Sequence, residues 1–443
     1  MNKGSFYIET YGCQMNVSDS EVVVSILVSN GYQKVSNIEQ SDIILLNTCS
    51  IRDKAEQTLL NRLDMVKHIK KRGSVIGILG CMAERLKDKL LEIDCINFVV
   101  GPDEYKSLPD IINKAFEGNK SVDVKLSTDE AYNDVIPQYG SGVSAFISIT
   151  RGCNNVCSYC VVPFTRGRER SKSVKAILRE VDCVTERGFK EITLLGQNVN
   201  SYRFDDGTTS CNFAQLLDII ANRVPDIRIR FLSSHPKDIN EELLNTIKNH
   251  KNICKNIQLP FQSGSNHILK LMNRPYTNEM YKEKINMIWD ILGKDCSLVT
   301  DIMTGFCDET EEDHQDTLRL MEYVKFDYAF TFAYSERSGT CSANTMCDNV
   351  PHDVKIRRLT EIINLQQTHS LYRYSQCVGK IVDVLVEGPS KRSELEWQGR
   401  ADDNKVVVFN NSEKLIHEGD YVKINVNDNT SATLMGEFIN TTE

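Results

Sequence analysis

Three closely spaced cysteines set the strictest condition on how this chain can fold. Cys153, Cys157 and Cys160 stand in the spacing C-x3-C-x2-C, within the segment Arg-Gly-Cys-Asn-Asn-Val-Cys-Ser-Tyr-Cys. Three thiolates this close together can hold three corners of a [4Fe–4S] cluster and leave one iron without a protein ligand. The segment therefore predicts a metal centre that stays open on one side, and the surrounding fold must leave room beside it.

A structural zinc site is the main alternative for clustered cysteines. Such a site needs four ligands, commonly arranged as two pairs. The closest histidines in the sequence are His68 and His235, and Cys183 lies well downstream, so a fourth ligand is missing nearby. We therefore favour the open cluster. The chemistry that most often uses an open iron is radical chemistry on S-adenosylmethionine (SAM), which yields a 5′-deoxyadenosyl radical.

Length and composition indicate an ordinary globular protein that works in a reducing compartment. A chain of 443 residues predicts two or three domains, at roughly one per 150 residues. No apolar run approaches the length of about 18 residues that a membrane span needs, and the N-terminus lacks the apolar core of a signal peptide. Fifteen cysteines in such a chain indicate metal ligands or free thiols. We expect a cytoplasmic location and no membrane partner.

The charge distribution is uneven. A net charge of −9 argues against a general nucleic-acid binder, yet residues 151–180 carry seven basic and two acidic residues, a local charge of +5. A basic strip beside a reactive site can guide a phosphate backbone, although a solvated helix start explains the same charges equally well. The candidate RNA contacts are Arg166, Arg168, Arg170, Lys172 and Arg337, with Lys391 and Arg392 near the C-terminus.

The first third of the chain alternates strand and helix patterns, which predicts a parallel α/β domain over residues 1–140. The expected strands are 6–10, 42–46, 75–79 and 96–100, and the expected helices are 18–29, 53–70, 84–93 and 105–116. Residues 121–144 are polar and rich in turn residues, which predicts a linker.

Cys13, Cys49 and Cys81 each follow one of the first three expected strands. The carboxyl ends of parallel strands share one edge of the sheet, and ligands bind at that edge. We therefore expect these cysteines to converge into a second three-thiol metal site, again with one iron open. Three separate buried thiols are the weaker alternative. Cys95 is not placed in this way, and we interpret it as a packing residue.

Residues 141–375 contain about six further strand–helix units. The expected strands are 145–150, 191–195, 228–233, 256–260, 298–303 and 328–333. Six units are too few for a closed eight-fold barrel, so we expect an open (β/α)6 partial barrel with a wide mouth. The last helix, near 352–374, carries Ile356, Leu359 and Ile363 on one face, which predicts that this face packs on the barrel.

Polar residues collect at the carboxyl ends of these strands, where a barrel of this kind binds its ligands. Gly196 would let the backbone approach a cofactor closely. His235 is either a cofactor contact or a hydrogen-bonded scaffold residue. The candidate cofactor-binding residues are Tyr159, Gly196, Gln197, Asn198, Ser234, His235, Gln262, Ser263, Asp301 and Tyr334.

Residues 376–443 read as a small all-β module similar to an OB barrel, with strands near 378–386, 405–409, 421–426 and 433–438. Such barrels often bind RNA. The segment is acidic overall, so Lys391 and Arg392 are its only candidates for a basic edge besides Arg400, and a plain docking module is the alternative.

The motifs together resemble those of the radical-SAM methylthiotransferases, over nearly the whole chain. The strings that carry the resemblance are Glu-Thr-Tyr-Gly-Cys-Gln-Met-Asn, Asn-Thr-Cys-Ser-Ile-Arg, Cys-Ser-Tyr-Cys-Val-Val-Pro-Phe-Thr-Arg-Gly and Leu-Leu-Gly-Gln-Asn-Val-Asn-Ser-Tyr. They are most similar to the branch that modifies isopentenylated adenosine in tRNA. The resemblance implies an N-terminal methylthiotransferase domain, a radical-SAM partial barrel and a C-terminal TRAM domain.

The resemblance also implies a reaction. Cys153, Cys157 and Cys160 would hold the radical-SAM cluster, and Cys13, Cys49 and Cys81 would hold an auxiliary [4Fe–4S] cluster that carries the sulfur to be donated. One SAM would methylate that sulfur, and a second would provide the radical that abstracts hydrogen from adenine C2. We also expect an external electron donor, a system that supplies sulfur or clusters, and a monomer.

Two other hypotheses remain open at this point. A sibling methylthiotransferase would act on threonylcarbamoyl-adenosine of tRNA or on an aspartate of a ribosomal protein. A non-catalytic RNA-binding protein would use the same cysteines to hold an iron–sulfur or zinc centre. Iron, sulfide and zinc content after anaerobic purification would separate that last class from the two enzymes.

Overall fold

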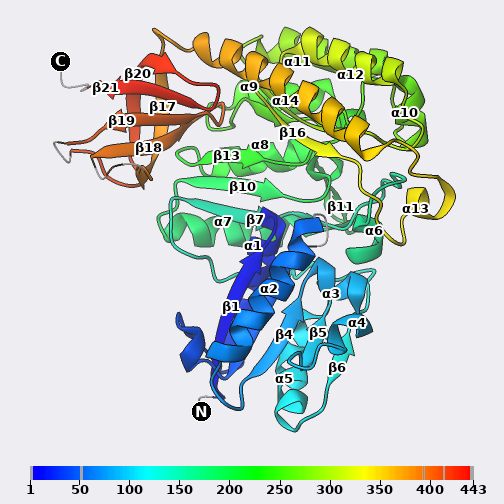
Figure 1. Cartoon of the computed structure of the whole chain (residues 1–443). Coiled ribbons are helices and arrows are strands. Elements are labelled where there is room, and N and C mark those ends of the chain that lie inside the picture. The colour runs from blue at the N-terminus through cyan, green and yellow to red at the C-terminus, as the bar shows by residue number, and fades with distance from the viewer. Residues whose placement is uncertain (1–2, 50–52, 392, 394, 413–414, 440–443) are drawn as a thin grey trace.

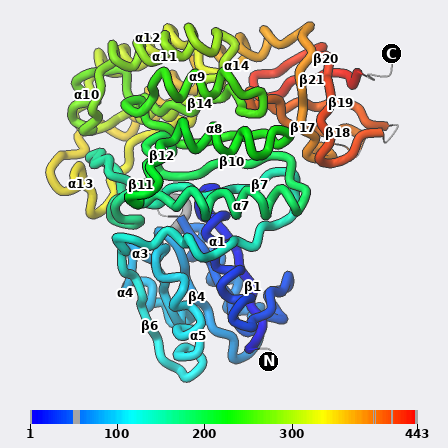
Figure 2. Tube along the Cα trace, turned by 180° about the vertical axis from the view of Figure 1, so that it is seen from behind, coloured from blue at the N-terminus to red at the C-terminus, as the bar shows by residue number. Residues whose placement is uncertain are grey.

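The computed structural model describes residues 3–49, 53–391, 393, 395–412 and 415–439. Its three parts follow one another along the chain: an α/β part at the bottom of Figure 1, a larger α/β part in the middle, and a small β-barrel at the upper left. Figure 2 shows the same succession from behind, with the barrel far from the N-terminal part. Across the described residues, no helix combines the length and apolar character that crossing a bilayer requires.

The N-terminal part is built on a parallel sheet in the strand order β2-β1-β3-β4-β5-β6. The strands are β1 Ser5–Tyr11, β2 Gln33–Lys34, β3 Ile43–Thr48, β4 Val75–Leu79, β5 Phe98–Val100 and β6 Ser121–Asp123. Strands β3 and β4 are buried along their whole length, as expected where helices cover both faces of a sheet. The predicted parallel α/β fold is confirmed. The predicted start of the linker is wrong, because β6 extends the sheet by pairing with β5.

Helices pack on both faces of this sheet (Figure 1). They are α1 Gln14–Ser29, η1 Ile38–Gln40, α2 Asp53–Ile69, α3 Cys81–Leu86, α4 Asp88–Leu91, η2 Tyr105–Ser107 and α5 Leu108–Phe116. Helix α1 begins directly after Cys13, four residues before the predicted start. The helix predicted over 84–93 is instead two short helices, broken at Lys87 with a φ of 46°. Because both helices begin earlier than predicted, Cys13 immediately precedes α1 and Cys81 is the first residue of α3.

The central part contains two parallel sheets, in the orders β13-β10-β7 and β14-β15-β16. Their strands are β7 Ser144–Ser148, β10 Glu191–Leu195, β13 Arg228–Phe231, β14 Asn256–Gln258, β15 Ser297–Thr304 and β16 Tyr328–Ala333. A bridge between Ile229 and Ile253 joins the two sheets. Among the described residues, β7 and β16 are not paired, so the strands form the open partial barrel that the sequence predicts.

Helices follow these strands and cover their outer faces. They are α6 Val162–Thr165, α7 Val174–Glu186, α8 Phe213–Arg223, α9 Glu241–Asn249, α10 Asn266–Leu271, α11 Asn278–Leu292, α12 Glu311–Val324, α13 Cys341–Thr345 and α14 His352–Ser375. Short strands β8 Thr150–Arg151 and β9 Arg170–Ser171 pair with each other beside the cysteine segment. One apolar core, which includes Ile192, Ile229 and Ile302, fills the space between strands and helices.

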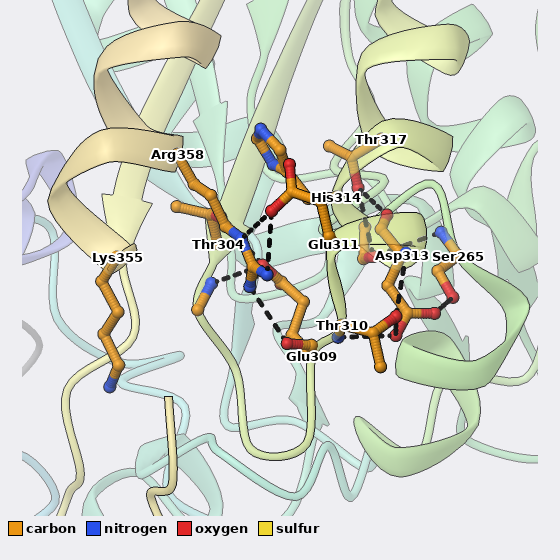
Figure 3. Close-up of polar contacts among 12 residues, drawn as sticks. Ser265, Thr304, Glu309, Thr310, Glu311, Asp313, His314, Thr317, Lys355 and Arg358 are labelled. Atoms are coloured by element: carbon orange, nitrogen blue, oxygen red, sulfur yellow. Dashed lines mark hydrogen bonds and ion pairs between the residues drawn. The ribbon is translucent and has the colours of Figure 1, made fainter. Parts of the chain in front are cut away.

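Helix α14 packs on the barrel partly through polar side chains, and its apolar contact comes from Ile362, not from the face predicted for it. Ile356 and Ile363 are 44% and 37% exposed, whereas Lys355 and Arg358 are buried. Arg358 donates through Nη1 to Glu309 Oε1 at 3.0 Å, as Figure 3 shows, and Lys355 pairs with Asp348 at 2.6 Å. A buried charge is tolerated where it is paired and hydrogen-bonded. The predicted apolar face was wrong because these paired charges share the buried face with Ile362, which turns Ile356 and Ile363 toward solvent.

The C-terminal part is a closed barrel in the order β17-β18-β19-β21-β20. Its strands are β17 Ile381–Pro389, β18 Glu396–Ala401, β19 Val406–Asn410, β20 Tyr421–Asn429 and β21 Thr433–Phe438. The predicted all-β module is confirmed, although strand β18 was not expected. Arg228 and Arg230 on β13 donate to backbone oxygens of Arg400 and Ala401 at 2.7 Å, which fixes the barrel to the central part.

Candidate active site

The first cysteine triad lies at the carboxyl edge of the N-terminal sheet. Cys13, Cys49 and Cys81 follow β1, β3 and β4, which are neighbours in that sheet. A Cβ added to Gly12 would lie 2.4 Å from Cβ of Cys49, and Gly12 has a φ of 128°. Only glycine combines that backbone conformation with so close an approach. A glycine is therefore required directly before Cys13, because the backbone there packs against Cys49.

The electrostatics of this triad favour a thiolate. A hydrogen bond from the Cys49 thiol, with help from the Arg166 guanidinium, lowers the pKa of Cys13 to about 6. Burial raises the pKa of Cys81, although Arg166 Nε donates to Cys81 Sγ at 3.1 Å. Thiolates are the form in which cysteine binds iron. Three converging, largely buried thiols beside a guanidinium therefore fit a [4Fe–4S] cluster.

The second triad lies in the loop between β8 and α6. Backbone N–H groups point at two of its sulfurs: Asn155 N lies 3.4 Å from Cys153 Sγ, and Val162 N lies 3.5 Å from Cys160 Sγ. Burial, and then the charge of Cys157, raises the pKa of Cys160 to about 12. Hydrogen bonds to sulfur and low solvent exposure are the means by which a protein tunes an iron–sulfur centre. The donor set therefore fits a cluster here as well.

Arg274 contributes a side-chain donor to the second triad. Its Nη1 donates to Cys157 Sγ at 3.1 Å, its Nε donates to the Tyr276 hydroxyl at 2.9 Å, and its Nη2 donates to the Pro260 carbonyl at 3.3 Å. Sequence reasoning missed this residue, because nothing in the pattern around residue 274 relates it to a loop so far upstream.

The two triads belong to segments that touch. Helix α3, which begins at Cys81, packs against α6, which begins two residues after Cys160, and Figure 1 shows the two helices side by side. Arg337, which follows β16, lies close enough to Cys49 to interact with it electrostatically. The two three-thiol sites therefore lie at the junction of the N-terminal and central parts.

Five buried polar atoms just beyond the carboxyl ends of β7, β10 and β13 have no hydrogen-bond partner within the described part of the chain. They are Thr150 Oγ1, Gln197 Oε1, Asn198 Oδ1, Ser234 Oγ and His235 Nε2. Buried polar groups are normally paired, so unpaired ones gathered at a barrel mouth indicate a polar ligand or ordered water. This chemistry fits SAM, which carries amino, carboxylate and ribose hydroxyl groups. Gly196 lets Thr150 pack directly against the backbone here, since a Cβ on residue 196 would lie 2.0 Å from Thr150 Oγ1.

His235 is neutral in this environment. Burial, followed by the positive charge of Arg274, lowers the pKa of its imidazole to about 2. Its Nδ1 accepts a hydrogen bond from the backbone N–H of Lys237 at 3.2 Å. A neutral ring that accepts at Nδ1 carries its proton on Nε2. His235 therefore offers one N–H donor to the mouth.

Asp301 lies in the carboxyl half of β15, and Gln262 lies beside that strand. Burial raises the pKa of Asp301 to about 6, and Gln258 Nε2 donates to its Oδ2 at 3.0 Å. Gln262 has a φ of 65° and donates its backbone N–H to the Asp301 carbonyl at 2.9 Å. Both residues remain candidates for cofactor contact.

Three other predicted cofactor contacts are engaged elsewhere. The Ser263 hydroxyl accepts from Ser265 N at 3.2 Å and is buried. The Tyr334 hydroxyl donates to Ser342 Oγ at 3.1 Å. The Tyr159 ring packs edge-on against Phe306, with ring centroids 6.3 Å apart. The hydroxyls of Ser263 and Tyr334 thus each make a hydrogen bond within the protein, and their contact with a cofactor stays a prediction.

The basic strip is mostly buried, which corrects the prediction that it contacts RNA. Arg166, Arg170 and Lys172 are only 3%, 6% and 3% exposed. They pair with Asp19, Asp103 and Glu180 at 2.7, 2.8 and 2.6 Å. A charge that is buried and already paired cannot serve a phosphate backbone. Arg168 and Lys391 are exposed, Arg337 is half-buried, and Arg392 lies outside the described residues.

Asp19 is a second residue that sequence reasoning missed. It lies on α1, is fully buried, and accepts from Arg151 Nη1 and Arg166 Nη2 at 2.7 Å each. Its carboxylate thus joins the N-terminal part to the two arginines that flank the second triad. An acidic residue within an apolar helix pattern gives no sign of such a role.

Three family models match the chain in succession. Residues 5–101 match the uncharacterized protein family UPF0004, residues 147–321 match the radical SAM superfamily, and residues 375–439 match the TRAM domain. These matches follow the three parts seen in the structure.

Curated relatives match over nearly the whole length. A protein from Amoebophilus asiaticus is 51% identical over 449 residues, which cover 98% of this chain and 92% of its own. A protein from Bacteroides thetaiotaomicron is 52% identical over 436 residues, which cover 97% of this chain and 95% of its own. Both are named tRNA-2-methylthio-N(6)-dimethylallyladenosine synthase.

Solved structures share the fold at low sequence identity. The radical S-adenosylmethionine methyltransferase TsrM from Kitasatospora setae, solved with cobalamin and a [4Fe-4S] cluster bound, aligns with a TM-score of 0.59 at 11% identity. The alignment covers 86% of this chain and 81% of that one. The cobalamin-dependent S-adenosylmethionine radical enzyme OxsB aligns with a TM-score of 0.53 at 14% identity, covering 82% of this chain and 56% of that one.

Proposed function

This chain belongs to the family of tRNA-2-methylthio-N(6)-dimethylallyladenosine synthases, which are radical-SAM enzymes, and from that premise we propose its reaction. It transfers a methylthio group to C2 of N6-isopentenyladenosine, the nucleoside on the 3′ side of the anticodon of tRNA. One observation carries the proposal: the two three-cysteine sites adjoin helices α3 and α6, which pack against each other. A single base held at that junction would face both.

SAM and [4Fe–4S] iron follow from the family, and the assignment of two clusters is our proposal. Cys153, Cys157 and Cys160 hold the cluster that works with SAM, and Cys13, Cys49 and Cys81 hold the auxiliary one. When bound, these groups supply a carbon-centred radical that removes the C2 hydrogen, a methyl group, and the sulfur for the new bond. Such chemistry is needed because the C2–H bond is unactivated, so acid–base groups alone do not break it.

The chain's own residues would bind SAM, orient it and shield it from water. The unpaired polar atoms of Gln197, Asn198 and Ser234 receive the polar groups of SAM, and His235 donates from Nε2. Gly196 allows Thr150 to stand close against the backbone in the wall of the mouth. Fixed donors and acceptors in a site with little water hold a reactant more firmly than solvent would, which positions it for reaction.

The target base must leave its stack in the anticodon loop to reach the cysteines. Bases in single-stranded loops are splayed out at low cost, and recognition of RNA commonly exploits this. We propose Arg168, Arg337 and Lys391 as backbone contacts, because Arg168 and Lys391 are exposed and Arg337 lies beside the first triad. The net charge of −9 limits RNA binding to such local sites.

Several further properties are proposed with this function. The methylthiotransferase, radical-SAM and TRAM domains span residues 1–140, 141–375 and 376–443. The enzyme works as a monomer in the cytoplasm, takes electrons from an external donor, and regains sulfur from a separate supply system. The sibling reactions on threonylcarbamoyl-adenosine or on a ribosomal-protein aspartate are not proposed, since the named relatives support the isopentenyladenosine reaction.

A substrate comparison tests the proposal. The anaerobically reconstituted enzyme is incubated with SAM, a reductant and one of three anticodon stem-loops, whose target adenosine is unmodified, isopentenylated or threonylcarbamoylated. Nucleosides are then analysed by mass spectrometry. We expect the methylthio adduct on the isopentenylated stem-loop alone. An adduct only on the threonylcarbamoylated one would assign the chain to the sibling reaction, and no 5′-deoxyadenosine with any substrate would refute radical-SAM chemistry.

A further inference from the structure

The guanidinium of Arg166 has three nitrogens in three different environments. Nε donates to Cys81 Sγ at 3.1 Å, and Nη2 donates to Asp19 Oδ2 at 2.7 Å. Nη1 is buried and has no hydrogen-bond partner anywhere in the described chain. An arginine offers five N–H donors, and a buried donor left unpaired is costly. Nη1 therefore lacks an acceptor that the completed site would supply.

Arg274 provides the contrast. It also donates to a cysteine sulfur at 3.1 Å, but its other two nitrogens bond to Tyr276 and to the Pro260 carbonyl. The two arginines thus make the same contact with their triads. Only Arg166 keeps a nitrogen in reserve, so the missing acceptor belongs to the first triad in particular.

The charges around Arg166 point to an anion. Three buried arginines, Arg151, Arg166 and Arg170, share two buried aspartates, Asp19 and Asp103. The ion-paired set therefore holds one positive charge more than it holds negative charges. An excess charge in the interior is expensive unless an opposite charge lies nearby. Cys81 contacts this positively charged set through its hydrogen bond with Arg166.

We propose that Arg166 is a positioning residue for the auxiliary sulfur centre, in which Nε holds the Cys81 thiolate and Nη1 donates to a second sulfur anion. The inference rests on the proposed function, which places an auxiliary cluster on Cys13, Cys49 and Cys81. Three thiolates on an oxidised [4Fe–4S] core, which carries two positive charges, give the centre one net negative charge. This charge would balance the one surplus positive charge of the arginine–aspartate set. The second sulfur is either a sulfide of the core or the sulfur awaiting transfer.

The contact also links the two parts of the chain. Arg166 follows α6, six residues after Cys160, and its partner Asp19 holds Arg151, which lies two residues before Cys153. The sulfur centre, the aspartate and the loop of the second triad thus form one hydrogen-bonded unit. Docking of the central part on the N-terminal part would bring the donor to the sulfur.

The consequence is electrochemical. Hydrogen bonds and positive charge beside a cluster stabilise its more negative, reduced form and raise its reduction potential. Loss of the guanidinium should therefore shift the midpoint potential of the auxiliary cluster to lower values. A residue that only holds the two domains together would not act on this quantity through its own charge.

The experiment uses the full chain with Cys153, Cys157 and Cys160 replaced by alanine, so that only the auxiliary cluster can form. Arg166→Gln is compared with Arg170→Gln, in which the lost arginine is equally buried and pairs with Asp103 across the same junction, without touching a cysteine. Iron and sulfide contents are measured by chemical analysis, and the midpoint potential of the cluster is measured by an EPR-monitored redox titration. We expect a lower potential in Arg166→Gln and a clearly smaller shift in Arg170→Gln, which loses one charge of the set but no hydrogen bond to sulfur.

Each other outcome has a distinct meaning. A parent protein without iron would refute the auxiliary cluster itself, and with it the proposed function. A loaded Arg166→Gln protein whose potential shifts no further than that of Arg170→Gln would overturn the role of Arg166 alone. If Arg166→Gln loses its iron, Arg166→Lys decides: the lysine keeps a cation but not the planar set of donors. Parent iron content and potential in that variant would also overturn the hydrogen-bond role.

Discussion

Arg274 donates a hydrogen bond from Nη1 to Sγ of Cys157 at 3.1 Å, across 117 residues of sequence. Arg166 makes the matching contact with Cys81 at 3.1 Å, across 85 residues. Each cysteine triad therefore has one thiol that is hydrogen-bonded to an arginine from a distant segment. The tertiary fold, and not the local cysteine motif, completes both candidate metal sites.

Replacing Arg274 by glutamine should slow the cleavage of SAM. A hydrogen bond to a charged group contributes about 1.5–3 kcal/mol, so its loss predicts a decrease of at least about tenfold in 5′-deoxyadenosine formation. The rate is measured anaerobically by chromatography of the nucleosides. Arg319→Gln, which changes an exposed arginine on α12, is the control. Equal rates in the two variants would show that the Arg274 contact is dispensable.

Replacing Asp19 by asparagine should destabilise the fold. The change leaves Arg151 and Arg166 buried without their shared carboxylate, and breaking a buried ion pair from one side costs about 3–5 kcal/mol. Urea unfolding of the apo-protein, followed by circular dichroism, measures the loss. Asp64→Asn breaks the exposed pair with Lys67 and should leave the midpoint nearly unchanged. Similar midpoints for both variants would contradict the electrostatic account of the junction.

The sequence was sufficient to propose the six candidate metal ligands, because their signals are local. The spacing of Cys153, Cys157 and Cys160 is visible in a single loop, and the position of Cys13 after a strand follows from hydrophobic pattern alone. The rule that parallel strands end at one edge then predicted where Cys49 and Cys81 would lie. The fold class followed from the same strand and helix patterns.

The polar partners could not be predicted, because a charge gives no sequence signal of its partner. Arg166 and Arg170 read as an exposed basic strip, whereas they are buried against Asp19 and Asp103 from the other domain. The face of helix α14 was mispredicted in a similar way, since Arg358 is buried against Glu309 while Ile356 faces solvent. Such pairs depend on how segments far apart in sequence pack, which hydrophobic periodicity does not encode.

His235 should make stability depend on pH. Its folded pKa of about 2 lies below the ordinary value of 6.5, so the unfolded chain binds the proton first as the pH falls. Stability should therefore be complete above pH 6.5 and should decrease below it, by up to about 1.4 kcal/mol per pH unit from this residue. Urea unfolding midpoints measured from about pH 8 down to about pH 5 would show this slope, because that range brackets the ordinary histidine pKa of about 6.5.

His235→Gln is the test of that assignment. It removes the titrating group and should flatten the slope, whereas His417→Gln, at an exposed histidine, should leave the slope as it is. An unchanged slope in His235→Gln would mean that another buried group, such as His369, whose pKa burial also lowers, accounts for it.

Gly12→Ala should remove the auxiliary cluster alone. The new Cβ would lie 2.4 Å from Cβ of Cys49, and the positive φ adds strain of about 1–2 kcal/mol. Gly73→Ala is the matched control, since it has a φ of 86° but nothing within 4 Å of the new Cβ. We expect the Gly12 variant to keep about half the parent's iron, and the Gly73 variant to keep all of it. Full iron in both would contradict the position of Cys49 in the cluster site.

The central claim is that the two triads have different roles in one reaction, and a pair of triple variants tests it most directly. Both are incubated anaerobically with SAM, reductant and isopentenylated stem-loop, and 5′-deoxyadenosine and the methylthio nucleoside are measured together. Alanines at Cys13, Cys49 and Cys81 should leave 5′-deoxyadenosine formation and abolish the methylthio product. Alanines at Cys153, Cys157 and Cys160 should abolish both. A methylthio product formed without Cys13, Cys49 and Cys81 would contradict the account.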